Sequence, residues 1–96
     1  MDVVIAYDIA TTTRAGQRRL TKISGVCERY GVRVQYSLFE CRLSEARFVK
    51  LRAELEEVID PRVDRVLLYR FEGSLQNAKV ALGAAVSRDL SQPWIV

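Results

Sequence analysis

The carboxylate of Asp8 is the first side chain along the sequence that could do chemistry. It directly follows the apolar, β-branched run at residues 3–7, and Asp2 is the only other acid among the first 27 residues. Functional groups collect where strands end and loops begin, and an ionised carboxylate is a hard ligand suited to Mg²⁺ or Mn²⁺. The alternative is a turn residue that accepts hydrogen bonds from nearby backbone N–H groups. One carboxylate is seldom a metal site, but two copies of Asp8 facing each other across a two-fold axis would supply two ligands.

Basic side chains gather in the next part of the chain. Residues 9–39 hold one acid and six cations, which are Arg14, Arg18, Arg19, Lys22, Arg29 and Arg33. At 100° per residue, one sector of a helix about 80° wide, opposite its apolar stripe, holds Arg14, Arg18, Lys22 and Arg29. A stripe of one sign predicts binding to phosphate groups, and an ordinary solvated helix face is the alternative. Arg19 lies nearer the apolar sector and could reach across an interface, whereas Arg33 could be an ordinary charge at a sheet edge.

The overall composition limits the chemistry further. Fifteen Lys and Arg against twelve Asp and Glu give a net charge of +3. Twelve of the fifteen cations are arginine, whose planar guanidinium binds phosphate oxygens in pairs better than the lysine ammonium does. The absence of histidine excludes His-based general bases, Ser-His-Asp or Cys-His nucleophilic sites and His-ligated metals. Two cysteines cannot form a three- or four-cysteine cluster. Cys27 and Cys41 are expected to be reduced packing residues in the core.

Three further residues sit near the middle of the chain. Tyr36 and Phe39 flank the point where two predicted strands meet, but the RNP pattern of an RNA-binding sheet is absent, so core packing is the expectation for both. Ser37 has no base to activate it and is not expected to be a nucleophile. No glycine-rich phosphate loop is present in the sequence.

The first elements that must position these residues are a strand and a long helix. Residues 3–7 predict a central strand buried on both faces. The threonines at 11–13 offer cap oxygens for a helix over residues 14–30. Gly31 is expected to close that helix in the left-handed conformation.

The remaining pattern completes a β-α-β-β-α-β order. Residues 32–43 predict two strands with a tight turn or bulge near 36–37, Ser44 caps a helix over 45–59, and residues 63–71 predict another strand. This is an α+β, ferredoxin-like sandwich in one domain, with a core at 1–71 and a tail at 72–96. The tail holds a short strand predicted at 78–83 and an apolar end at 94–96, which would be a liability if exposed. We expect an extra C-terminal strand that packs against a second copy in a homodimer.

Targeting signals are not apparent in the sequence. No stretch reaches the roughly 18 apolar residues of a membrane span, and the N-terminus has no basic region before its strand-like run. The expected setting is the cytoplasm.

Two segments together resemble the small CRISPR-associated adaptation proteins of the Cas2 family. They are residues 3–9 (VVIAYDI) and residues 30–40 (YGVRVQYSLFE). The segments 59–61 (IDP), 64–66 (DRV) and 69–70 (YR) also fit. The tail, with LG at 82–83, DL at 89–90 and PWIV at 93–96, is similar to the C-terminal signature of one branch of the family. The similarity covers essentially the whole chain.

The resemblance implies a ferredoxin-like homodimer in which each C-terminal strand completes the sheet of its partner. It places the metal-binding aspartate at Asp8 with Tyr7 beside it, and it matches the second motif at Arg33, Ser37 and Phe39. Basic residues of the family correspond approximately to those of the helix, namely Arg14, Arg18 and Arg19. It implies Mg²⁺-dependent endonuclease activity on RNA or DNA, with Mn²⁺ as a substitute. It also implies a role as the bridge to the larger CRISPR integrase subunit, Cas1, with the dimer holding duplex by its backbone.

Two other functions fit a chain of this size. One is a toxin-type endoribonuclease of similar small fold, which an adjacent integrase gene and repeat array would argue against. The other is a ferredoxin-like small-molecule sensor, which would need a ligand loop, and no long glycine-rich loop is present.

Overall fold

The structure is a computed structural model, and it describes residues 1–84 of the 96. Its elements follow the order β1 (Asp2–Asp8), α1 (Arg14–Tyr30), β2 (Gly31–Gln35), β3 (Leu38–Arg42), α2 (Glu45–Val58), β4 (Arg65–Phe71) and α3 (Leu75–Ala78). The strands form one sheet in the order β2-β3-β1-β4, and every neighbouring pair is antiparallel. The predicted α+β, ferredoxin-like β-α-β-β-α-β order is therefore confirmed.

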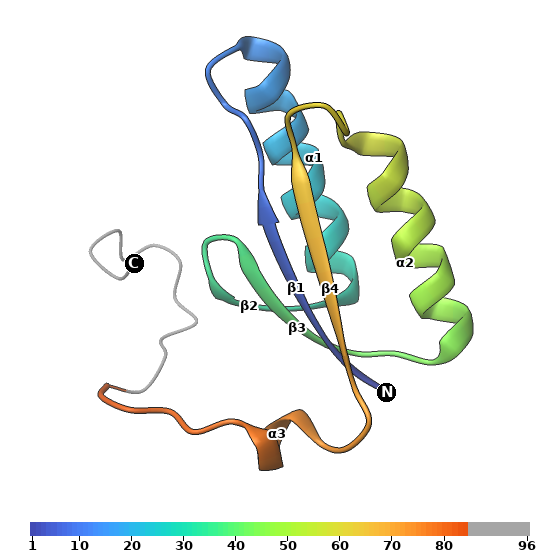
Figure 1. The fold of residues 1–96 in the computed structure, drawn as a ribbon, viewed down its shortest axis with the longest axis vertical. Helices are drawn as coiled ribbons and strands as arrows, with labels where there is room; N and C mark the ends of the chain where they lie inside the picture. The colour runs from blue at the N-terminus through green and yellow to red at the C-terminus, as the bar shows by residue number, and fades with distance from the viewer. Residues whose placement is uncertain (85–96) are drawn as a thin grey trace.

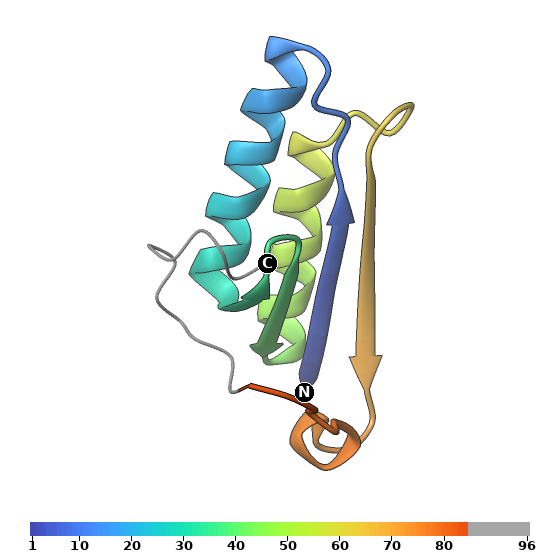
Figure 2. The same ribbon diagram turned by 90° about the vertical axis from the view of Figure 1, so that its left-hand side faces the viewer.

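The molecule has two layers. Figures 1 and 2 show α1 and α2 side by side on one face of the sheet, while the other face, called here the open face, carries no helix of the described chain. The short α3 lies at the end of the sheet where β4 finishes. This arrangement places the end of β1, and with it Asp8, at the opposite end of the sheet.

The core lies between the sheet and the helices. Side chains of β1 alternate, so that Val3, Ile5 and Tyr7 are buried against the helical layer, whereas Asp8 is exposed. The predicted central position of this strand is confirmed, but its burial on both faces is not. Within residues 1–84, only one face of the sheet is covered, so Val4 and Ala6 of the open face are only partly buried.

The ends of α1 are set by two local contacts. Thr13 Oγ1 accepts a hydrogen bond of 3.0 Å from the Gly16 N–H, which confirms the predicted cap. Gly31 ends the helix in extended backbone, with φ −160°, and not in the left-handed conformation expected from the sequence. A β-carbon at this position would collide with Cys41 Sγ and the Glu40 carbonyl, so glycine is required there by the close approach of β3.

The second half of the chain follows the predicted pattern with smaller differences. A turn at 36–37 separates β2 from β3, with an irregular register between Arg33 and Gln35, and Ser44 caps α2 through Arg47 N–H. β4 begins at Arg65 and not at residue 63, because the N–H groups of Val63 and Asp64 both bond to the Asp60 carbonyl in a turn.

Of the predictions for the tail, one is wrong and the others fall outside the described residues. No strand forms over 78–83; the described tail instead makes the single turn of α3 and then continues without regular structure to residue 84. The apolar end at 94–96 and the extra C-terminal strand lie outside the described residues. Within residues 1–84, no helix has both the length and the apolar character that crossing a membrane would require.

Both cysteines pack in the core. Cys27 and Cys41 are free and buried. Burial raises the pKa of the Cys27 thiol to about 12 and that of the Cys41 thiol to about 11. The prediction of unreactive packing residues is confirmed.

Candidate metal and nucleic-acid site

Asp8 lies at the carboxyl end of β1 and points to the open face of the sheet. Its side chain is exposed, and its partner directly across the antiparallel pair is Arg65, the first residue of β4. The two charges do not form an ion pair, and among residues 1–84 neither has another ionic partner. The carboxylate is thus free of ionic partners within the described residues, and its role as a metal ligand stays a prediction.

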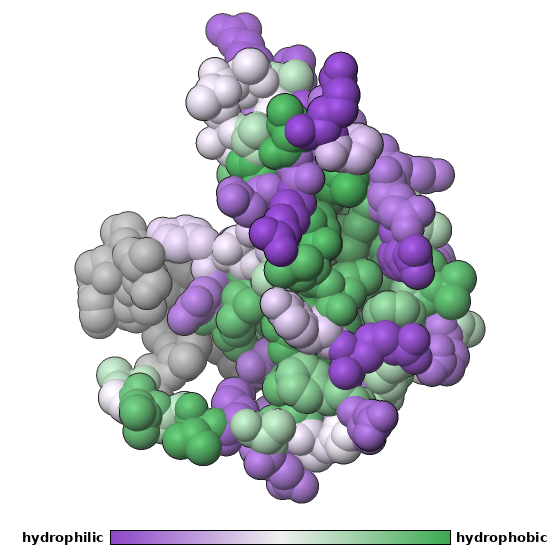
Figure 3. Space-filling view, viewed as in Figure 1, coloured by the Kyte–Doolittle hydropathy of each residue, from purple (hydrophilic) through white to green (hydrophobic). Residues whose placement is uncertain are grey.

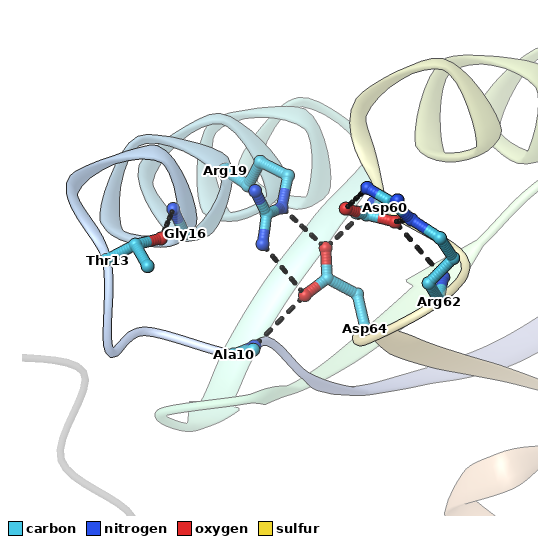
Figure 4. A network of polar contacts seen from close by, with 7 residues as sticks. All are labelled: Ala10, Thr13, Gly16, Arg19, Asp60, Arg62 and Asp64. Atoms are coloured by element: carbon cyan, nitrogen blue, oxygen red, sulfur yellow. Dashed lines mark hydrogen bonds and ion pairs between the residues drawn. The ribbon is translucent and has the colours of Figure 1, made fainter.

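A buried carboxylate fixes the loop that follows Asp8. Figure 4 shows Asp64 between the β1–α1 loop, helix α1 and the α2–β4 turn. Its Oδ2 accepts 2.7 Å from Arg19 Nε and 2.8 Å from Asp60 N–H, and its Oδ1 accepts 3.0 Å from Ala10 N–H. The Asp64 side chain has no exposed surface. One carboxylate therefore holds three segments of the chain together.

The surroundings of Asp64 favour its ionised form. Burial pushes the pKa of its carboxyl up, but the hydrogen bonds from Arg19 and from two backbone N–H groups outweigh burial and leave the pKa below its usual value. The neighbouring Asp60 is held by Arg62, whose guanidinium hydrogen bonds lower the pKa of Asp60 to about 2. Both carboxylates are occupied within the chain and are not offered to a metal.

A metal centre does not assemble within one described chain. Residues 1–84 contain no group of three or more Asp, Glu, Cys or His side chains that could hold a metal ion. Among residues 1–84, Asp8 is the carboxylate without an ionic partner at this edge. The expectation that two copies of Asp8 share a metal ion stays a prediction.

Tyr7 is next to Asp8 in sequence but faces the other way. Its hydroxyl lies 2.9 Å from Ser24 Oγ and donates to the Tyr36 carbonyl at 3.0 Å, and its ring stacks on Phe39 with centroids 6.2 Å apart. Burial raises the pKa of the Tyr7 hydroxyl. Tyr7 therefore braces the β2–β3 turn from inside.

The other residues of the second motif serve that same turn. The Ser37 carbonyl accepts 3.1 Å from Tyr7 N–H. Phe39 is fully buried, so its predicted packing role is confirmed. The same prediction for Tyr36 is wrong, because this residue is 57% exposed at the tip of the turn.

Two of the predicted phosphate-binding cations have partners in the fold. Arg19 is joined to Asp64, and it reaches across to the α2–β4 turn within its own chain. Arg33 bonds the Tyr36 carbonyl at 2.9 Å and Glu28 at 3.1 Å, and its guanidinium lies 4.9 Å from the centre of the Phe39 ring. The structure does not bring Arg19 and Arg33 together with the other predicted cations.

The other three form a continuous basic surface. Arg14, Arg18 and Lys22 are exposed, and with Gln17 and Thr21 they line a shallow groove along the outer face of α1. None of these three cations has an ionic partner among residues 1–84. We call Arg14, Arg18 and Lys22 the α1 stripe. It lies on the side of α1 away from the sheet, so the α1 stripe and Asp8 belong to opposite faces of the sandwich.

Sequence reasoning assigned no site role to Arg65 or Asp64. Both are related to residues more than 40 positions away along the chain: Arg65 lies opposite Asp8 in strand register, and Asp64 bonds to Arg19. No local spacing marks such pairs, because only strand register and helix packing create them. The burial of Asp64 is itself a product of that packing.

The fold and this edge define a class: a small ferredoxin-like domain with one carboxylate at the end of its central strand and a basic helix behind it. The sequence profile described as CRISPR associated protein Cas2 matches residues 1–78. The chain belongs to this family of CRISPR-associated proteins.

Individual relatives agree over nearly the full length. The chain is 42% identical to the CRISPR-associated endoribonuclease Cas2 of Chlorobaculum tepidum, over all of both chains. It is 37% identical to the CRISPR-associated endonuclease Cas2 of Halalkalibacterium halodurans, over 99% of each. The crystal structure of Streptococcus pyogenes Cas2 superimposes with a TM-score of 0.77 and 37% identity, covering 86% of this chain and 100% of that one.

Proposed function

We propose that this chain is a homodimeric nucleic-acid-binding subunit of CRISPR adaptation, and that it bridges the spacer-integrating complex through contact with the integrase subunit, Cas1. Within this dimer, the two Asp8 carboxylates hold Mg²⁺ and support endonuclease activity on RNA or DNA. The observation that carries the catalytic part is the exposed carboxylate of Asp8 at the end of β1, which has no ionic partner among residues 1–84. Family membership carries the biological role.

The open face supports the dimer. Val4, Ala6 and Leu67 are partly buried and Tyr69 is 51% exposed, all on this face. Figure 3 shows hydrophobic residues gathered over the middle of the face and hydrophilic ones toward its rim. An exposed apolar patch of this kind is typical of an interaction surface. A second copy of the chain would cover it and bring a second Asp8 to the same interface.

The chemistry proposed for this edge needs few protein groups. Bound Mg²⁺ would polarise the phosphate and orient the attacking water. Asp8 would hold the ion, the Asp64 network keeps the loop after Asp8 in place, and the α1 stripe neutralises phosphates of the bound strand. The names endoribonuclease and endonuclease given to the relatives support cleavage as the reaction class.

A metal-titrated cleavage assay tests this proposal. Purified full-length protein is incubated with RNA and with duplex DNA of the same sequence over a range of Mg²⁺ or Mn²⁺ concentrations. Asp8→Ala should abolish metal-dependent cleavage while leaving duplex binding unchanged or slightly tighter, because a negative charge is removed. Glu57→Ala is the matched control, since Glu57 is an exposed acid on α2.

The outcomes separate the parts of the proposal. Cleavage that survives in Asp8→Ala removes Asp8 from the reaction or reveals a contaminating nuclease. The bridging role is tested by size-exclusion chromatography of this protein mixed with a Cas1 integrase subunit from the same source. Two separate peaks at micromolar concentration would contradict bridging.

A further inference from the structure

The charged residues of the open face differ in how they are paired. Asp2 and Arg42 lie opposite each other across β1 and β3 and form an ion pair of 3.0 Å. Glu40 of β3 is bonded to Lys79 at 3.2 Å. Asp8 and Arg65 lie opposite each other across β1 and β4, yet they form no ion pair.

The unpaired state of Asp8 and Arg65 is not caused by distance along the strands. Residues directly opposite in an antiparallel pair share a face, with β-carbons about 4.5–5.5 Å apart. Long side chains at that spacing easily reach each other, as Asp2 and Arg42 do. Here the two backbone positions are paired on one face, and neither charge has an ionic partner among residues 1–84.

The backbone around Asp8 and Arg65 is held in place. Arg65 directly follows Asp64, and Ala10 comes two residues after Asp8. The Asp64 carboxylate accepts from Ala10 N–H at 3.0 Å, so the same buried group fixes the end of β1 and the start of β4 (Figure 4). The backbone that carries Asp8 and Arg65 is therefore ordered before a ligand arrives. This order reduces the entropy cost of binding a ligand between them.

We infer that Arg65 binds a phosphate group of the nucleic acid at the Asp8 edge. This inference rests on the proposed function and adds a substrate contact to it. A guanidinium presents a fork of donors that matches two phosphate oxygens, and Asp8 beside it is placed for a cation on the same phosphodiester. Arg65 thus supplies a phosphate-binding cation on the open face, as the α1 stripe does on the other side of the sandwich.

A nearby arginine provides the contrast. Arg62 is three residues earlier, and its side chain is 85% exposed, but its guanidinium makes two hydrogen bonds to Asp60. The two arginines have the same charge and lie at the same end of the molecule. A long-range electrostatic effect on nucleic-acid binding would therefore be similar for both, whereas a direct phosphate contact would distinguish them.

The experiment measures binding of full-length protein to a labelled duplex DNA and to a single-stranded RNA of the same sequence at several salt concentrations. The variants are Arg65→Ala, Arg65→Lys and, as the matched control, Arg62→Ala. The two alanine variants each lose one cation per subunit, and Arg65→Lys keeps it. In a dimer, Arg65→Ala should lower the slope of log K against log salt by about 1.8 for duplex and about 1.4 for single strands. Arg65→Lys should keep most of the slope, and Arg62→Ala should change it much less than Arg65→Ala does.

Light scattering on the same samples tests the alternative role of Arg65, which is a contact between the two subunits. If Arg65 instead pairs with an acid of a second copy, Arg65→Ala would weaken the dimer before any nucleic acid is added, and the inference is overturned. Equal slopes for Arg65→Ala and Arg62→Ala also overturn it while leaving the proposed function intact. Failure of the wild-type protein to bind either substrate contradicts the proposed function itself. A drop close to the expected value for only one of the two substrates identifies which of them is held at this edge.

Discussion

The outer face of α1 and the open face of the sheet use their residues in different ways. The α1 stripe places three cations at positions i, i+4 and i+8 on a single helix, so helix geometry alone aligns them. The open face is largely apolar, and among residues 1–84 Asp8 is its carboxylate without an ionic partner. Under the proposed function, backbone binding by charge would be a local property, whereas the metal-dependent site would be a property of assembly.

Asp64 connects the two faces. Through Arg19 it holds α1, and through Ala10 N–H it holds the end of β1. A substitution on one face should therefore affect that face alone, whereas a substitution of Asp64 should affect both.

The largest effect is expected from a charge in the apolar part of the open face. Leu67→Glu places a carboxylate where the proposed second copy packs, and burying it unpaired is costly. The variant should be a monomer by light scattering, should lose metal-dependent cleavage completely and should keep the binding that the α1 stripe provides in each subunit. Val49→Glu is the control, because Val49 is 64% exposed on α2. If the Leu67→Glu protein is still a dimer, the dimer interface does not lie on the open face.

A smaller but measurable effect should follow from changes on the other face. Arg14→Ala combined with Arg18→Ala removes four cations per dimer, so the slope of log K against log salt for duplex DNA should fall by roughly 3–4. The loss should be independent of base sequence, because phosphate contacts position a duplex without reading it. Binding isotherms at several salt concentrations measure it. An unchanged slope would make the α1 stripe an ordinary solvated helix face.

The same experiment needs a charge control. Arg52→Ala combined with Arg62→Ala removes the same number of cations from arginines that are ion-paired to Glu56 and Asp60. Its slope should change much less. Equal changes in the two double variants would show that net charge alone matters.

The connecting residue should affect stability more than either surface. Asp64→Ala leaves Arg19 without its partner and frees two backbone N–H groups, and the free energy of unfolding should fall by about 3 kcal/mol. Urea unfolding measures this loss, and Asp64→Asn should lose less because it retains an acceptor. A loss below about 1 kcal/mol would contradict the connecting role of Asp64.

Acid should produce the same loss in the wild-type protein. The pKa of Asp64 is lowered in the fold, and that of Asp60 is lowered to about 2. A carboxyl with a lowered folded pKa contributes stability above its unfolded pKa of about 3.9, and the contribution is lost as pH falls through the folded value. Wild-type stability should therefore fall between about pH 4 and pH 2, and Asp64→Ala should show a shallower fall by urea unfolding in acetate and phosphate buffers.

The smallest effect is expected from the layer between the two faces. The raised pKa values of about 12 for Cys27 and about 11 for Cys41 leave little thiolate at pH 8. Alkylation of the folded protein should be more than about a hundredfold slower than that of a free cysteine, and treated protein should bind nucleic acid unchanged. Mass spectrometry measures the labelling. Rapid labelling without urea would show that this layer opens readily.

Much of this molecule was predictable from local pattern. The helix over 14–30, the cap at Ser44, the turn at 36–37 and the end position of Asp8 all depend on neighbours within a few residues. Caps, hydrophobic periodicity and turn positions are encoded at that range. The α1 stripe was predictable for the same reason, since helix geometry alone aligns residues four apart.

The tertiary structure decided which of those residues are available. Arg19 and Arg33 have the same side chain as Arg14, yet packing joins the first to Asp64 and the second to Phe39 and Glu28. Gly31 shows the same limit, because its requirement for glycine comes from the approach of Cys41 on another strand.

The amino-acid sequence by itself determined the order of elements, the basic helix and the acid at the strand end. Only the folded chain decided that Arg65 faces Asp8, that Asp64 joins both faces, and that the α1 stripe and Asp8 point in opposite directions. The physical reason is the range of the interactions. Helices and turns form from contacts between near neighbours, whereas strand register and ion pairs between distant residues depend on how the whole chain buries its apolar surface.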